Sequence, residues 1–126
     1  MNLPFIQIPG LSVRVDNVMH LPTLETPSDK PYAFVYFLAI VNTSDTVVTV
    51  KGRKWVVTES SGEAVVVEGP GVVGETPTLG KGEEFSYNSC HVIAHDAVAR
   101  GSLFGVTEAG EMFSVEIPEF TMKVPS

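Results

Sequence analysis

"YAFVYFLAIVN", residues 32–42, contains the longest apolar run of the chain and points to an all-β fold. Its residues are apolar on both faces of an extended chain, as is typical of a central strand whose second face is also covered. The run "YAFVYFLAIV" has ten residues, about half of the ~20 that a membrane-spanning helix needs. We therefore expect a buried strand here and no association with a membrane.

The stretches on either side of this segment also have the patterns of strands. "FSVEIPEF", residues 113–120, alternates apolar and polar residues, which is the period of two of a half-buried strand, and "LSVRVDNV", residues 11–18, does the same. Segments rich in β-branched residues lie between them, with Gly52 as a predicted β-bulge and "SSGE", residues 60–63, as a hairpin loop. About seven strands, with a turn signal roughly every 8 to 12 residues, predict an antiparallel β-sandwich.

Composition and charge limit the class of protein. A chain of 126 residues with 44% hydrophobic and 18% charged residues suits a single globular domain over residues 1–126. The single cysteine, Cys90, excludes an intramolecular disulfide, and "MNLPFIQIPG" lacks the basic start of a secretion signal, so we expect a cytoplasmic protein. The net charge of −7, with the eight Lys and Arg scattered, argues against nucleic-acid binding.

"GPGVVG", residues 69–74, has the glycine spacing of a Rossmann dinucleotide loop. Such a loop must open a helix, but Pro77, Gly80 and Gly82 stand where the helix would grow, and they cost helix stability, proline by ~3 kcal/mol and glycine by ~1 kcal/mol. We therefore interpret these glycines as allowing positive φ and close backbone approach in a connection between two sheets. A small-molecule or nucleotide site in the Gly69–Gly74 loop is the alternative.

Three blocks of the sequence resemble the successive motifs of the ApaG domain family. They are "RKWVVTESSGE" (residues 53–63), "VEGPGVVGETPTLGKGEEFSYNS" (residues 67–89) and "GEMFSVEIPEFTM" (residues 110–122). The resemblance covers about residues 12–123 and leaves residues 1–10 as an N-terminal extension; residues 90–104 resemble the family least. It implies a fibronectin-III-like or immunoglobulin-like sandwich without an established activity, linked in bacteria to cobalt and magnesium homeostasis and appended in eukaryotes to larger proteins.

From this resemblance we expect a non-catalytic protein-interaction module that needs no cofactor and has a protein partner, with homo-oligomerisation left open. The candidate interaction loop consists of Gly69, Gly71, Val72, Val73, Gly74, Glu75 and Pro77, and further family-motif positions are Arg53, Trp55, Tyr87 and Ser89. The family usually has a histidine where this chain has Lys54, so no role of that histidine carries over. We expect Val72 and Val73 to tuck into the sandwich, and Trp55 to anchor the core rather than lie on an exposed face.

A metal-binding protein is the other alternative, because the segment from Cys90 to Asp96 includes His91 and His95. On an extended strand, positions 91 and 95 lie ~13 Å apart at ~3.3 Å per residue, too far to share one ion. We therefore expect no metal site, with His91, His95 and Asp96 as weak candidates. The chain also lacks a GxSxG nucleophile motif, and no other residue set supports an enzyme.

Overall fold

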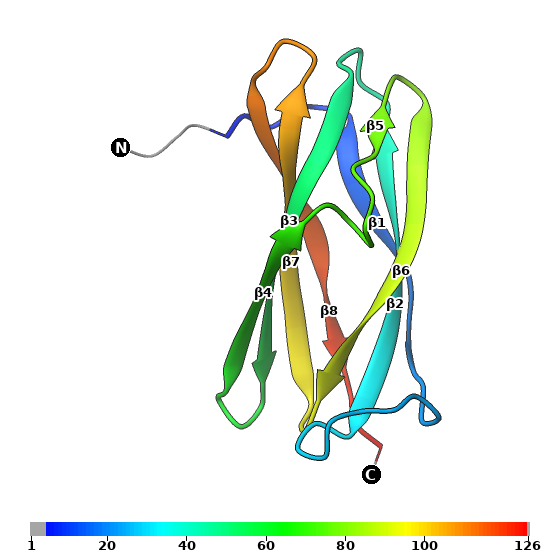
Figure 1. Ribbon diagram of the computed structural model, residues 1–126, viewed down its shortest axis with the longest axis vertical. Coiled ribbons are helices and arrows are strands. Elements are labelled where there is room, and N and C mark those ends of the chain that lie inside the picture. Colours follow the sequence, from blue (N-terminus) through cyan, green and yellow to red (C-terminus); the bar gives the residue numbers. More distant parts are fainter. Residues whose placement is uncertain (1–4, 126) are drawn as a thin grey trace.

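The computed structural model describes residues 5–125, in which eight strands form two antiparallel sheets packed face to face (Figure 1). One sheet has the order β1-β2-β6, and the other has the order β4-β3-β7-β8, with the short β5 also pairing with β3. The antiparallel β-sandwich predicted from the sequence is confirmed. No helix in the described range is long and apolar enough to cross a membrane. The strands are β1 (Leu11–His20), β2 (Tyr32–Asn42), β3 (Val48–Glu59), β4 (Ala64–Pro70), β5 (Thr78–Leu79), β6 (Glu83–Ile93), β7 (Ala97–Thr107) and β8 (Met112–Met122).

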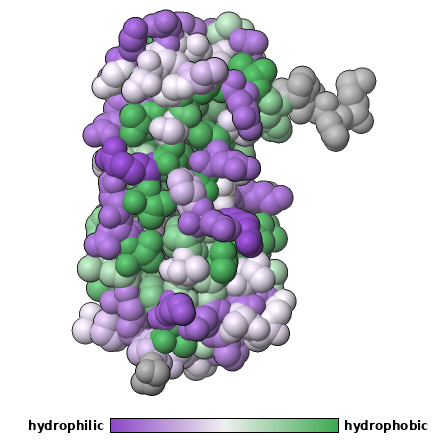
Figure 2. Space-filling model, turned by 180° about the vertical axis from the view of Figure 1, so that it is seen from behind, coloured by the Kyte–Doolittle hydropathy of each residue, from purple (hydrophilic) through white to green (hydrophobic). Residues whose placement is uncertain are grey.

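β2 is the central strand of the three-stranded sheet, as its apolar sequence predicted. Its inward side chains are buried in the core: Phe34, Tyr36, Leu38 and Ile40. The prediction that its second face is also covered was wrong, because the fold has only two layers (Figure 1). Val35, Phe37 and Val41 on that face are half-buried, flanked by the paired residues of β1 and β6. Seen from behind, hydrophobic side chains reach the surface along much of the sandwich, interspersed with hydrophilic ones (Figure 2).

β3 is one continuous strand that runs through the position of the predicted bulge at Gly52. Its pairing with β7 shifts register between Val50 and Gly52, which confirms the predicted bulge. Beyond the bulge, the Trp55 ring packs against that of Tyr36 with 5.0 Å between the ring centroids, and Trp55 is only 1% exposed. A Cβ at Gly101 of β7 would come within 2.7 Å of the indole ring, so this position needs glycine. Trp55 is thus the core anchor that we expected.

Part of the predicted N-terminal extension belongs to the sandwich. Ile6 forms a parallel bridge with Phe113 of β8, and Ile8 is buried in the core. The Ile6 N–H donates to the Met112 carbonyl over 2.9 Å, which adds the segment to the edge of β8. Residues 1–4 of that predicted extension lie outside the described residues.

Candidate functional site

The candidate interaction loop connects β4 to β5 through a tight turn. The Val72 N–H donates to the Glu75 carbonyl over 2.8 Å, and the Glu75 N–H donates to the Val72 carbonyl over 3.0 Å. The two central residues, Val73 and Gly74, have φ of 50° and 78°, and positive φ at both positions is the signature of a type I′ turn. The loop therefore runs from strand to strand and opens no helix at its glycines.

The two valines of this loop have opposite environments. Val72 is completely buried and contributes to the core, whereas Val73 is 56% exposed. Our expectation that both would tuck in was correct for Val72 and wrong for Val73, because Val73 stands at the tip of the turn. Within residues 5–125, Val73 is the one non-glycine residue with positive φ. That conformation costs a β-branched residue about 1–2 kcal/mol, and Asn or Gly would adopt it more easily.

Arg53 on β3 holds the start of the loop in place. Its Nη1 donates to the Pro70 carbonyl over 2.9 Å and to the Gly71 carbonyl over 3.1 Å. The guanidinium packs against Gly69, where a Cβ would come within 2.9 Å of Nη1 and Nη2. The family-motif positions Arg53, Gly69 and Gly71 are thus parts of one local structure. Sequence reasoning missed this role of Arg53, because the two segments lie on different strands.

β4 leaves one edge of its sheet open directly before the loop. It pairs with β3 on one side only, and its three consecutive valines remain exposed: Val65 by 37%, Val66 by 55% and Val67 by 37%. Three β-branched residues predict a strand, but they do not distinguish an edge strand from a central one. An exposed apolar edge presents unpaired backbone groups and is a template for another chain.

Tyr87 and Ser89 lie on β6 with His91, across the interior from β3. The Tyr87 hydroxyl is buried and has no hydrogen-bond partner among the described residues. Burial raises the pKa of this hydroxyl above its usual range, and the neighbouring Tyr36 adds to the shift. Ser89 and His91 both line a groove between the two sheets. These positions therefore belong to the inner faces of the sandwich rather than to the loop.

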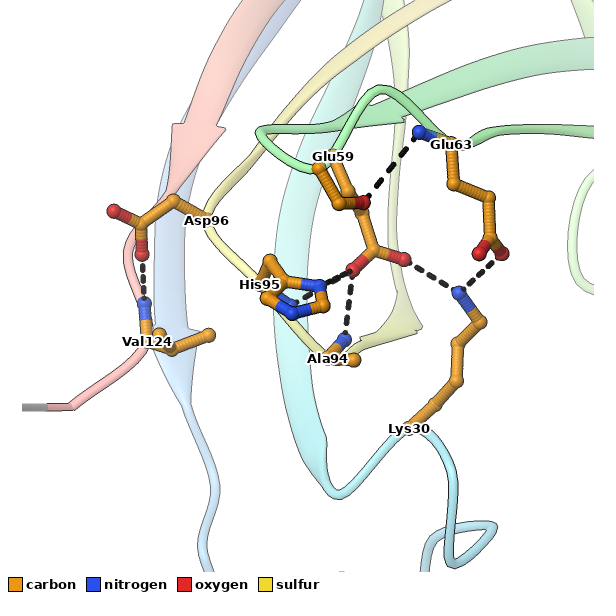
Figure 3. Close-up of polar contacts among 8 residues, drawn as sticks. Lys30, Glu59, Glu63, Ala94, His95, Asp96 and Val124 are labelled. Carbon is orange, nitrogen blue, oxygen red and sulfur yellow. Dashed lines mark hydrogen bonds and ion pairs between the residues drawn. The ribbon is translucent and has the colours of Figure 1, made fainter.

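The weak metal candidates do not converge. The His91 ring packs between Tyr36 and Trp55, with centroid distances of 4.7 and 4.8 Å, and burial lowers its pKa to about 4. His95 contacts the Glu59 carboxylate instead, while the Asp96 carboxylate accepts from the Val124 N–H over 2.7 Å (Figure 3). Throughout residues 5–125, no three His, Cys, Asp or Glu side chains are grouped so that they could hold a metal ion.

Glu59, at the end of β3, forms a buried polar centre that the sequence analysis did not single out. Its Oε1 accepts from the backbone N–H groups of Ala94 and His95, and its Oε2 accepts from Lys30 Nζ over 2.5 Å (Figure 3). Burial alone would raise the Glu59 pKa, but the hydrogen bonds from Lys30, His95 and Ala94 outweigh it and lower the pKa to about 2. These bonds tie the β6–β7 turn to β3 and to the loop before β2.

Comparison with known proteins agrees with the motifs and with the fold. The profile of the ApaG domain matches residues 22–106. The Protein ApaG of Shewanella woodyi is 37% identical over 116 residues, covering 90% of this chain and 92% of that protein, and that of Nitrosomonas europaea is 40% identical over 116 residues, covering 90% and 91%. A crystal structure described as an ApaA protein from Bordetella pertussis superposes with a TM-score of 0.82 at 33% identity, covering 97% of this chain and 98% of that one. The chain belongs to the ApaG family.

Proposed function

We propose that this chain is a non-catalytic protein-interaction module whose contact surface is the loop of residues 69–77 together with the open edge of β4. The observation that carries the proposal is Val73, an exposed β-branched side chain in a strained backbone conformation at a turn tip. Folding alone does not need valine there, because Asn or Gly would form the same turn at lower cost. Local strain that the rest of the fold must support is found most often at functional sites.

The neighbouring elements support a protein partner over a small ligand at this loop. The exposed valines of β4 precede it directly, and apolar side chains beside an open sheet edge suit the addition of a partner strand. Glu75 adds an exposed carboxylate next to Val73, which suits a contact at the rim of an interface. A nucleotide is disfavoured, because the turn offers no helix N-terminus and the chain has a net charge of −7.

The family resemblance implied a role in cobalt and magnesium homeostasis. The domain would then affect metal homeostasis through the protein that it binds. The side chains of this domain that could bind a metal do not face one another. His91 lies in the interior, His95 contacts the Glu59 carboxylate, and the Asp96 carboxylate accepts from the Val124 N–H. In this proposal the domain changes metal handling by binding another protein rather than by holding the ion. A homo-oligomer that uses the β4 edge would be a special case of the same surface.

Quantitative capture from native extract tests the proposal with a matched pair of variants. Val73→Asn removes the apolar contact while suiting the turn, so its melting temperature should not fall. Leu24→Asn is the control, because Leu24 is also an exposed apolar loop residue, at 43%. We expect wild type and Leu24→Asn to retain the same stoichiometric partner, and Val73→Asn and Glu75→Ala to retain markedly less of it. Equal retention by folded Val73→Asn would place the interaction elsewhere.

A further inference from the structure

A groove between the two sheets is the second feature of the molecule that suits binding. It has a volume of about 370 Å³ and lies where β3 and β4 of one sheet face β2 and β6 of the other. Tyr36, Trp55 and His91 line its interior, Val65 and Val67 of β4 form one wall, and Arg53 also lines it. Pockets of this size, apolar with a few polar groups, are typical of sites for small ligands.

Two polar side chains of this groove, His91 and Arg53, have nitrogen atoms without a hydrogen-bond partner within residues 5–125. The His91 side chain is 7% exposed, and its Nε2 has no hydrogen-bond partner in that part of the chain. Arg53 uses only Nη1, toward the Pro70 and Gly71 carbonyls, so the donors on Nη2 and Nε have no described partner. The other two arginines, Arg14 and Arg100, each pair with a carboxylate, whereas Arg53 pairs with none among the described residues.

The chemistry of these groups selects a ligand. The groove exposes the apolar side chains of Val65 and Val67 at 37% each, above a floor formed by the buried Tyr36 and Trp55, and such an apolar lining suits a flat ring. The free donors of a guanidinium match a carboxylate in the bidentate geometry. His91 is neutral at pH 7 because burial lowers its pKa to about 4. Lys30 and Glu59 also line the groove, but the Lys30 ammonium is paired with Glu59 and Glu63, so Arg53 supplies the positive charge that is free to bind an anion. One such charge in a chain of net charge −7 favours a monoanion over a phosphate dianion.

We propose that the groove between the sheets binds an aromatic carboxylate, with the ring against Val65 and Val67 above the buried Trp55 and the carboxylate on Arg53. The same chemistry is present in a free aromatic acid and in the C-terminal phenylalanine of a peptide. The groove shares Val65 and Val67 of β4 with the proposed protein contact surface, but binding of a small acid is measured on the domain alone, so this proposal can fail or hold independently of the protein partner. Arg53 also holds the Pro70 and Gly71 carbonyls, which places the site beside the interaction loop.

Titration with phenylacetate, followed by ¹H–¹⁵N NMR, tests this proposal on the purified protein. The chain has one tryptophan, so its single indole N–H signal reports on the groove without assignment of the whole spectrum. We expect a saturable shift with a dissociation constant of about 1 mM or lower, as the small size of the probe allows. Neutral phenylacetamide and cationic benzylamine should bind at least about tenfold more weakly, because they lose the charge-assisted hydrogen bonds.

Variants then locate the site. Val65→Glu places a negative charge on the groove wall, and its matched control is Val66→Glu on the same exposed strand, because Val66 does not line the groove. We expect Val65→Glu and Arg53→Gln to weaken phenylacetate binding at least about tenfold, whereas Val66→Glu and Val73→Asn bind like wild type. Arg53→Gln also removes the contacts that hold the loop, and this variant could unfold for that reason. In that case the comparison of Val65→Glu with Val66→Glu still tests whether phenylacetate binds in the groove.

Two peptides distinguish the sources of the ligand: an acetylated tripeptide ending in phenylalanine, and the same peptide as its C-terminal amide. Tighter binding of the free-acid peptide than of phenylacetate supports the site and assigns it to a peptide C-terminus. Tighter binding of phenylacetate supports the site and assigns it to a free aromatic acid. No indole shift up to about 20 mM phenylacetate, equal binding of phenylacetamide, or unchanged binding by Val65→Glu would overturn the proposal.

Discussion

At the scale of single residues, two of the three glycines of the interaction loop, Gly71 and Gly74, differ in the space that surrounds them. Both have positive φ, but a Cβ at Gly71 would clash with the backbone carbonyl of Glu75, whereas a Cβ at Gly74 meets nothing within 4 Å. Gly74→Ala should therefore cost only the strain of positive φ, about 1 kcal/mol, and Gly71→Ala should cost clearly more. Urea unfolding of the two variants measures the difference. Equal losses would mean that the loop backbone moves freely to accept the new methyl group.

His91 makes a second residue-scale prediction, about acid sensitivity. Its folded pKa of about 4 lies below the ordinary 6.5, so between these values the native state keeps the ring neutral while the unfolded chain takes up a proton. The stability that His91 contributes is complete above pH 6.5 and falls as the pH drops to 4, by up to about 3 kcal/mol. The difference in unfolding free energy between wild type and His91→Phe should follow this curve. A difference that is constant from pH 7.5 to 4 would contradict it.

Some of these residue roles could be predicted from the sequence, and others could not. The burial of Trp55 could be predicted because a tryptophan in a sandwich strand usually packs in the core. The absence of a helix after the loop glycines could be predicted from the proline and glycines that follow them in the sequence. The opposite environments of Val72 and Val73 depend on which one stands at the tip of the turn, and two adjacent valines give no indication of that. The burial of Glu59 depends on Lys30 and on the β6–β7 turn, which are distant in the sequence.

At the scale of secondary structure, Glu59 links three elements, and its loss should be costly. Glu59→Ala leaves the Ala94 and His95 N–H groups without their acceptor and leaves Lys30 with Glu63 alone, so we expect a loss of about 3 kcal/mol at pH 7. Glu63→Ala is the control, because its side chain is 59% exposed and its contact with Lys30 is worth under about 1 kcal/mol. Urea unfolding measures both variants. A small loss in Glu59→Ala would show that water replaces the carboxylate.

The positions of the strands along the sequence could be predicted better than the order in which the strands pair in the sheets. The alternation in residues 11–18 and 113–120 locates β1 and β8, because side chains of a strand point alternately to its two faces. β4 and β2 show the limit: both are rich in apolar residues, yet β4 is an exposed edge and β2 is a central strand. Which strand lies at an edge depends on pairing between distant segments, and local composition carries no information about that.

At the scale of the whole molecule, the proposed binding surfaces lie together on one long side of the sandwich. The open edge of β4, the loop of residues 69–77 and the groove between the sheets are adjacent, and Arg53 contacts the loop while lining the groove. The outer face of the three-stranded sheet, with Val35, Phe37 and Val41 half-buried, is the competing surface. The two surfaces lie on different parts of the fold, so one experiment can distinguish them.

Hydrogen exchange of the domain, alone and bound to its captured partner, tests the central claim most directly. Amide groups that become buried in an interface exchange more slowly, so the change in rate maps the contact surface. We predict slower exchange on binding in residues 64–77, where β4 has an open edge, and little change in residues 33–41. Protection confined to residues 33–41, with unchanged exchange in residues 64–77, would contradict the account.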